Sequence, residues 1–212
     1  ADASLIVNTT PVGMYPNCPA SPLVPGTIER LASLRGVIDV VYNPERTGIM
    51  LDADRLGIPA ESGLVMLVGQ AWLSSSMWQG RELDEELIGS IESDLMRQCR
   101  NVALIGMPGS GKTSAGRNLA ELCGRTFVDM DVDFSERYGR TPADVINEDG
   151  EQTFRRMETE ALAEVAKRSS LVISCGGGVV TRPENLPLLR QNSTVVMIDR
   201  KAEELSSRGR PI

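Results

Sequence analysis

The stretch NVALIGMPGSGKTSAGRNLAELC, residues 101–123, decides the fold of the second half of this chain. Within it, Gly106, Gly111, Lys112 and Thr113 complete the pattern G-x-x-x-x-G-K-T. Glycines in such a loop let backbone N–H groups point into one concavity, and a following helix N-terminus adds partial positive charge. The stretch therefore predicts a nucleoside triphosphate site.

The residues on either side of the loop agree with this interpretation. Residues 102–105 are apolar and predict a short buried strand, and residues 113–122 predict a helix with one apolar face. Strand, glycine loop and helix are the context that the motif requires. We expect Lys112 to reach the β- and γ-phosphates and the Thr113 hydroxyl to ligate Mg²⁺. The residues expected to bind ATP are Gly109, Ser110, Gly111, Lys112, Thr113 and Ser114.

The composition narrows the classes of protein and partner. With 41% hydrophobic and 24% charged residues, the 212-residue chain resembles a globular protein. A net charge of −7 and the lack of a Lys/Arg block argue against nucleic acid as a partner. No apolar run approaches the ~20 residues of a membrane span. The four cysteines form no C-x-x-C pair, which is typical of reduced thiols in a cytoplasmic protein. The sequence does not indicate an oligomeric state.

The chain contains no histidine. This excludes Ser-His-Asp and Cys-His catalysis and histidine-ligated zinc, so acid–base chemistry must use carboxylates, lysines or water. The chain begins at Ala1 and stops at Arg210-Pro211-Ile212, and from these ends we expect a fragment truncated on both sides.

Residues 1–80 alternate between predicted strands and helices. The expected helices are residues 27–34, 47–56 and 64–78, and the expected strands are residues 4–7, 37–42 and 58–60. This alternation with short loops predicts an α/β unit, about half of a parallel sheet.

Residues 81–100 are acidic and carry one apolar stripe. Leu83, Leu87, Ile91 and Leu95 recur every four residues, as on an amphipathic helix. We interpret the segment as a docked connecting helix with a solvated acidic face, and a separate partner-binding helix is the alternative. The expected domains are therefore residues 1–80 and 101–212, with the boundary at 81–100.

A second strand is predicted at residues 125–128, ending in Asp129-Met130-Asp131. Two carboxylates at i and i+2 of a strand lie on the same side, so both can face the phosphate loop. One could hold Mg²⁺ and the other accept a hydroxyl proton. A calcium loop is excluded, because Phe134 and Arg140 occupy the positions where Gly and Glu are needed.

The remaining elements complete a parallel α/β domain. Pro142 begins a helix, and a helix to about residue 167 is expected to bury Phe154, Met157, Ala161 and Val165. Strands are predicted at residues 171–174 and 194–198, and a helix begins at 201–207. Three glycines, Gly176, Gly177 and Gly178, follow the third strand and allow a close approach to the backbone or a simple turn. From spacing alone, Arg155 and Arg156 are more typical of surface residues than of ligands.

The motifs of residues 4–80 resemble the C-terminal half of shikimate dehydrogenase. They are NTTPVGM, DVVYNP followed two residues later by Thr, SGLVMLVGQA and WQG, in that order. The resemblance implies contacts of Tyr42 and Gln70 with shikimate, and of Val40, Gly63 and Met66 with the nicotinamide of NADP. Core packing is an equal alternative for Val40 and Met66.

This resemblance covers only part of a dehydrogenase. No G-x-G-x-x-G fingerprint precedes the motifs, so the pyrophosphate-binding half of the dinucleotide fold is missing. The family's catalytic Lys and Asp belong to a separate domain that is absent here. We therefore expect no dehydrogenase activity from this chain alone.

Residues 101–212 closely resemble shikimate kinase. The motifs are GMPGSGKT, DMD, DGE followed by FRR and Glu, CGGG and RPI, in the family's order. The resemblance implies a P-loop, nucleoside-monophosphate-kinase-like parallel α/β domain that uses Mg²⁺ and transfers the γ-phosphoryl group of ATP to the 3-hydroxyl of shikimate. It assigns Arg155 to the substrate carboxylate, Asp131 to the substrate hydroxyls as candidate base, Asp129 and Thr113 to Mg²⁺, Gly176–Gly178 to the substrate ring, and Arg210 to the lid that neutralises phosphate charge.

The sequence departs from the kinase pattern in two places. Ile146 stands where the family usually has an aromatic residue, which could loosen packing on the substrate ring. The chain also ends within the lid, so the second carboxylate-binding arginine and the adenine loop lie beyond Ile212.

Two neighbouring activities of one pathway suggest a piece of a bifunctional enzyme. The alternatives are a gluconate-kinase-like enzyme and a non-catalytic nucleotide-binding module.

Overall fold

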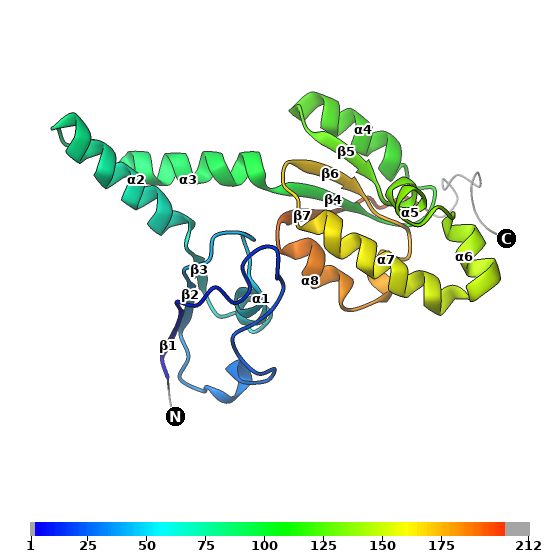
Figure 1. The fold of residues 1–212 in the computed structure, drawn as a ribbon, viewed down its shortest axis with the longest axis horizontal. Coiled ribbons are helices and arrows are strands. Elements are labelled where there is room, and N and C mark those ends of the chain that lie inside the picture. The colour runs from blue at the N-terminus through cyan, green and yellow to red at the C-terminus, as the bar shows by residue number, and fades with distance from the viewer. Residues whose placement is uncertain (1–2, 202–212) are drawn as a thin grey trace. The chain divides into compact units, whose positions relative to one another are not determined.

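The computed structural model describes residues 3–201. The chain divides into two compact units, Ala1–Cys99 and Arg100–Ile212. Each unit is built on one parallel β-sheet, as the ribbon in Figure 1 shows. Both units are therefore α/β, a partial Rossmann-like unit followed by a P-loop kinase-like unit, as the sequence predicted.

Unit 1 has three parallel strands in the order β1-β2-β3. They span Leu5–Asn8, Gly36–Asp39 and Ala60–Ser62. Helix α1 (Gly48–Arg55) packs against the sheet, with Val37, Ile49 and Ala53 buried between them. Asp39 is fully buried at the carboxyl end of β2, where its carboxylate accepts hydrogen bonds from Asn8 (3.0 Å) and Thr47 (2.6 Å).

The helix predicted over residues 27–34 is wrong. Only a 3₁₀ turn, η1 (Ile28–Arg30), forms there, and Gly36 begins β2 instead of capping a helix. Ile28 and Leu34 are both buried in the core of unit 1. The two residues are buried from an irregular segment, and their spacing in the sequence happens to resemble that of the apolar face of a helix.

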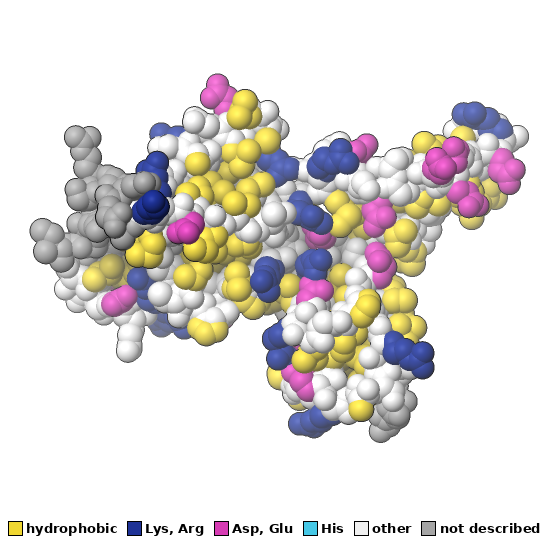
Figure 2. Space-filling model, turned by 180° about the vertical axis from the view of Figure 1, so that it is seen from behind, with side chains coloured by type: hydrophobic (Ala, Val, Ile, Leu, Met, Phe, Trp, Pro, Cys, Tyr) yellow, Lys and Arg dark blue, Asp and Glu magenta, His cyan; other side chains and the backbone are white. Residues whose placement is uncertain are grey.

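Unit 1 ends in two long helices, α2 (Leu64–Gln79) and α3 (Glu86–Cys99), which pack against each other. Helix α2 ends at Gly80, which adopts a left-handed conformation. The indole N–H of Trp72 donates to the Asp84 carbonyl, 3.0 Å away. Hydrophobic side chains are exposed along both helices (Figure 2). Among the described residues, Val68 is the one buried residue of α2, and α3 has no buried residue.

Unit 2 has a four-stranded parallel sheet in the order β5-β6-β4-β7. The strands are β4 (Asn101–Ile105), β5 (Thr126–Asp129), β6 (Leu171–Ser174) and β7 (Ser193–Met197). Helix α4 (Lys112–Cys123) covers one face, where Leu104 and Val172 are buried. Helices α7 (Glu151–Ala166) and α8 (Asn185–Arg190) cover the other, over Ala103 and Ile173 (Figure 1).

Two short helices connect β5 to α7. Helix α5 (Met130–Tyr138) and helix α6 (Pro142–Asp149) pack beside α7 through Phe134, Val145 and Phe154. The helix start predicted at Pro142 is confirmed, and Thr141 caps it through a reciprocal pair of hydrogen bonds with Asp144. Helices α5 and α8 were not predicted, and η2 (Val179–Thr181) follows the glycine turn. The helix expected from residue 201 lies outside the described residues, apart from Lys201 itself.

In the described range 3–201, no helix is both long and apolar enough to cross a membrane.

Candidate active site

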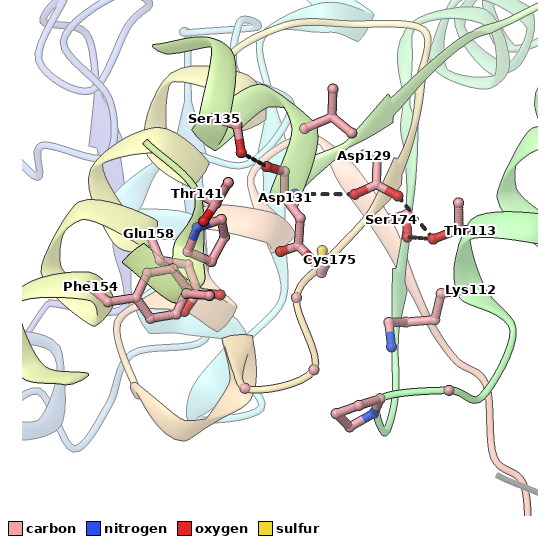
Figure 3. A pocket seen from close by; sticks show the side chains of 18 of the residues that line it. Lys112, Thr113, Asp129, Asp131, Ser135, Thr141, Phe154, Glu158, Ser174 and Cys175 are labelled. Carbon is pink, nitrogen blue, oxygen red and sulfur yellow. Dashed lines mark hydrogen bonds between the residues drawn. The ribbon is translucent and has the colours of Figure 1, made fainter. Parts of the chain in front are cut away.

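One pocket opens at the carboxyl ends of β4, β5 and β6. Its volume is about 1140 Å³, which exceeds the usual range for a single small ligand. Figure 3 shows the side chains that converge on it. Of the predicted kinase residues, those lining the pocket are Gly109, Gly111, Lys112, Thr113, Ser114, Asp129, Asp131, Arg155, Gly176, Gly177 and Gly178. Ser110 does not line it, and Arg210 lies outside the described residues.

The phosphate loop has the backbone that its glycines allow. Gly106, Gly109 and Gly111 have φ values of 145°, 79° and 96°, which L side chains rarely adopt. The Lys112 ammonium donates to the carbonyls of Gly106 (2.8 Å) and Met107 (2.9 Å). The loop is thus folded around its own lysine.

Burial decides the electrostatics of this lysine. Lys112 is only 8% exposed, and its desolvation lowers its pKa, although Asp131 and Asp129 oppose the shift. Bound phosphate would supply the negative charge that a buried ammonium lacks. The Ser110 hydroxyl is also buried and has no hydrogen-bond partner within the described part of the chain.

Asp129 and Asp131 both line the pocket, but not as neighbours on a strand. Asp129 ends β5 and caps helix α5, because its carboxylate accepts from the Asp131 N–H at 3.1 Å. Asp131 lies in the first turn of α5. The expectation of two same-side strand carboxylates is therefore wrong, and the helix turn carries Asp131 toward the pocket instead (Figure 3).

Asp129 pairs with the hydroxyl that follows the phosphate loop. The Thr113 hydroxyl donates to Asp129 Oδ2 at 2.9 Å and lies 3.4 Å from the Ser174 hydroxyl. The described residues contain no cluster of three or more His, Cys, Asp or Glu that could hold a metal by themselves. A hydroxyl and a carboxylate nevertheless fit Mg²⁺, which usually takes one or two protein oxygens together with phosphates and waters.

Asp131 is accessible from the open pocket but has protein on several sides. Desolvation raises its pKa, and the nearby Asp129 raises it further, while Lys112 and Arg155 act in the opposite direction. A carboxyl group with a raised pKa is a better proton acceptor than an ordinary surface aspartate. Its position and pKa direction both suit a general base.

Arg155 is held by two carboxylates on its own helix. Its guanidinium donates to Glu158 at 2.9 Å and to Glu151 at 3.2 Å. Burial alone would lower the pKa of Arg155, but these hydrogen bonds raise it above its ordinary value. The side chain of Arg155 is 22% exposed and that of Glu158 is 7% exposed, so Arg155 is a fixed cation in the pocket wall.

Sequence reasoning missed three polar groups of the pocket. Glu158 lies three residues after Arg155 in the FRR-x-Glu motif, and that helical spacing could have identified it. Ser174 stands opposite Asp129 in the register of β5 and β6. Cys175 is buried, and burial raises the pKa of its thiol to about 12. Ile146, the predicted departure, is half-buried, lines the pocket and packs with Phe154.

Three of the five dehydrogenase-like residues of unit 1 lie at or just after the carboxyl end of β2, namely Val40, Tyr42 and Gly63. The Gly63 N–H donates to the Val41 carbonyl at 3.1 Å, and a Cβ at Gly63 would lie 2.0 Å from the Val40 carbonyl oxygen. Tyr42 is exposed, and Met66 and Gln70 are exposed one turn apart on α2. Because Met66 is 48% exposed, unit 1 itself does not bury it in a core.

Comparisons with known proteins identify relatives of the region that forms this pocket. The family model described as "Shikimate kinase" matches residues 108–210. The shikimate kinase of Symbiobacterium thermophilum is 46% identical over 110 residues, which cover 52% of this chain and 63% of that protein. The structure of shikimate kinase from Acinetobacter baumannii in complex with shikimate matches with a TM-score of 0.50 and 38% identity, covering 53% of this chain and 63% of that one.

A dehydrogenase structure also matches, at a lower level. Shikimate dehydrogenase 1 from Peptoclostridium difficile is 36% identical over 45% of this chain and 34% of its own, with a TM-score of 0.41. The chain spans less than two thirds of the length of the kinase relatives named above. Within unit 2, residues 108–210 therefore match the shikimate kinase family.

Proposed function

We propose that this protein transfers the γ-phosphoryl group of ATP to the 3-hydroxyl of shikimate. One observation carries the proposal: the phosphate loop, a carboxylate with a raised pKa and a fixed arginine line the same pocket. The family match over residues 108–210 supports ATP as the phosphoryl donor. An acidic small molecule that carries a hydroxyl is the acceptor chemistry that these groups fit.

Arg155 would hold the acceptor by its carboxylate. A guanidinium binds a carboxylate through two parallel hydrogen bonds, which fixes orientation as well as position. Glu151 is exposed and can leave the guanidinium, whereas Glu158 is buried and keeps its contact. The backbone of Gly176–Gly178 lines the same pocket and would support the acceptor ring.

Asp131 would accept the proton of the attacking hydroxyl. The acceptor oxygen then forms a bond to the γ-phosphorus, the bond from that phosphorus to the β,γ-bridging oxygen breaks, and ADP leaves with that oxygen. Lys112 would exchange its two loop carbonyls for phosphate oxygens and so neutralise charge that develops during transfer. Arg210, proposed as the lid arginine, lies outside the described residues.

Thr113 and Asp129 are the residues proposed to hold Mg²⁺. Mg²⁺ bound there would neutralise charge on the β- and γ-phosphates. The 2.9 Å hydrogen bond directs the Thr113 hydroxyl proton to Asp129, so that a lone pair of the hydroxyl oxygen could ligate a cation.

The proposal is tested by ADP release in the presence of ATP, Mg²⁺ and shikimate, with gluconate as the control acceptor. We expect release that depends on shikimate and is lost in Asp131→Asn, which keeps the size of the side chain. Release with gluconate alone would favour a gluconate-type kinase. Nucleotide binding without release for either acceptor would favour a non-catalytic module.

We further propose that residues 4–80 are the C-terminal half of an NADP-dependent shikimate dehydrogenase, so that the chain is part of a bifunctional enzyme. The order of the motifs supports this, together with the clustering of Val40 and Gly63 at the end of β2. Tyr42 and Gln70 would contact shikimate, and Met66 would contact the nicotinamide. Because the pyrophosphate fingerprint is missing from this chain, we expect it to oxidise no shikimate with NADP, and measurable turnover would contradict that expectation.

A further inference from the structure

The three consecutive glycines after β6 each lie against a different part of the active site. An added Cβ would lie 2.6 Å from Glu158 Oε1 at Gly176, 2.5 Å from Pro108 Cγ at Gly177, and 2.4 Å from the Arg155 guanidinium at Gly178. Cβ atoms essentially never approach other heavy atoms within 3.0 Å. The turn therefore touches the acceptor side and the phosphate loop at once.

Backbone conformation does not explain these glycines. None of Gly176, Gly177 and Gly178 has a positive φ, and the φ of Gly178, −97°, is one that any residue can adopt. What each position requires is space for its neighbour. The neighbouring residue that each glycine contacts therefore explains why a side chain does not fit there.

Pro108 differs from the other two partners. Glu158 and Arg155 present the ends of their side chains, which can move by rotation about their torsions at the cost of the hydrogen bond between them. The Pro108 ring is rigid, and its Cδ and backbone nitrogen would lie 2.7 and 3.1 Å from a Cβ at Gly177. A side chain at Gly177 would therefore displace the phosphate loop itself.

The phosphate loop is seated at a second point. A Cβ at Gly106 would lie 2.4 Å from the Ile198 carbonyl oxygen, just beyond β7. The loop start is thus fixed by the chain after β7, and Pro108, two residues later, by the turn after β6. The residues that follow, from Gly109 to Thr113, are those that line the pocket or lead into α4.

We propose that Pro108 is a positioning residue. Its ring packs on Gly177 and so sets the spacing between the nucleotide bound by the phosphate loop and the acceptor that rests on the backbone of Gly176–Gly178. The acceptor part of this inference rests on the proposed function, whereas the seating of the loop does not. In the folded protein, the ring of Pro108 occupies the space that a side chain at Gly177 would need. A change on one side of the contact should be corrected by a change on the other.

The test compares Gly177→Ala, Pro108→Ala and the double variant, using calorimetric titration with MgADP. Overpacking by one methyl group against a rigid neighbour should weaken MgADP binding about tenfold in Gly177→Ala. Pro108→Ala removes Cγ and Cδ, so the double variant should recover to within about threefold of the wild type. Gly89→Ala, on exposed α3 with open space around it, is the matched control and should bind normally.

A second titration with shikimate separates the two sides of the turn. Gly178→Ala should weaken shikimate binding and leave MgADP binding unchanged, because it displaces Arg155 and not the loop. Normal MgADP binding by folded Gly177→Ala would overturn the inference, and so would a defect that Pro108→Ala fails to correct. Wild-type protein that binds MgADP but no shikimate would instead count against the proposed function. The contact between Pro108 and Gly177 would then still be tested by the MgADP titrations of the variants.

Discussion

Replacement of Arg155 by Met should destabilise unit 2 in a way that depends on pH. The guanidinium donates to Glu158 at 2.9 Å, and the Glu158 side chain is 7% exposed. Met keeps much of the volume of the aliphatic stem but leaves this carboxylate buried without its partner. Desolvation already raises the pKa of Glu158, and the loss of Arg155 removes the main group that opposes this shift and leaves only the weaker effect of Arg182.

The size of the effect follows from the geometry. A hydrogen bond to a charged group contributes about 1.5–3 kcal/mol, and the 22% exposure of Arg155 places this pair at the lower end. A loss of about 1.5 kcal/mol corresponds to a fall in melting temperature of about 6 °C for a unit of this size. A carboxyl group whose pKa is raised by folding contributes stability that is lost as the pH rises through that pKa. The deficit of Arg155→Met should therefore be small near pH 4.5 and largest above neutral pH.

The assay is thermal unfolding by far-UV circular dichroism from pH 4.5 to 8. The protein has two tryptophans, Trp72 and Trp78, and both lie in unit 1, so fluorescence checks that unit 1 is unaffected. Glu158→Gln in the Arg155→Met background is the control and should remove the pH dependence. A deficit of the same size at pH 4.5 and pH 8 would refute the account of the buried pair.

Three further predictions follow from single contacts. Thr141→Ala removes the cap of α6 and should lower the melting temperature by about 5 °C, which circular dichroism would detect. A thiol reagent at pH 8 should modify the exposed Cys99 and Cys123 quickly and spare Cys175, whose pKa is about 12; rapid labelling of Cys175 in native protein would contradict its burial. Asp131→Asn should raise the melting temperature at neutral pH but not below pH 4, because it removes a carboxyl group whose pKa folding raises; lower stability at neutral pH would oppose that pKa direction.

The central elements of unit 2 could be predicted from the sequence because their signals are local. The apolar run before the phosphate loop became β4, and the helix after the loop became α4 with shifts of one residue at each end. Pro142 marked the start of α6 because proline is favoured in the first turn of a helix. The third strand matched residues 171–174 as predicted.

The errors have two physical causes, a helix cap that the strand pattern did not reveal and burial in the tertiary fold. Asp131 was placed on a strand, but the Asp129 carboxylate caps a new helix there. Ile28 and Leu34 have helical spacing, but they reach the core from irregular chain. Glu158 was overlooked because a buried glutamate is exceptional, and only its contact with Arg155 in the folded protein makes it part of the site.

The most direct test of the proposed function is identification of the product by ³¹P and ¹H NMR after incubation with ATP, Mg²⁺ and shikimate. We predict a phosphate monoester at the 3-hydroxyl, formed together with one equivalent of ADP, and no product from Asp131→Asn. Phosphate on another hydroxyl would contradict the placement of the acceptor between Arg155 and Asp131. Inorganic phosphate alone would contradict phosphoryl transfer to shikimate.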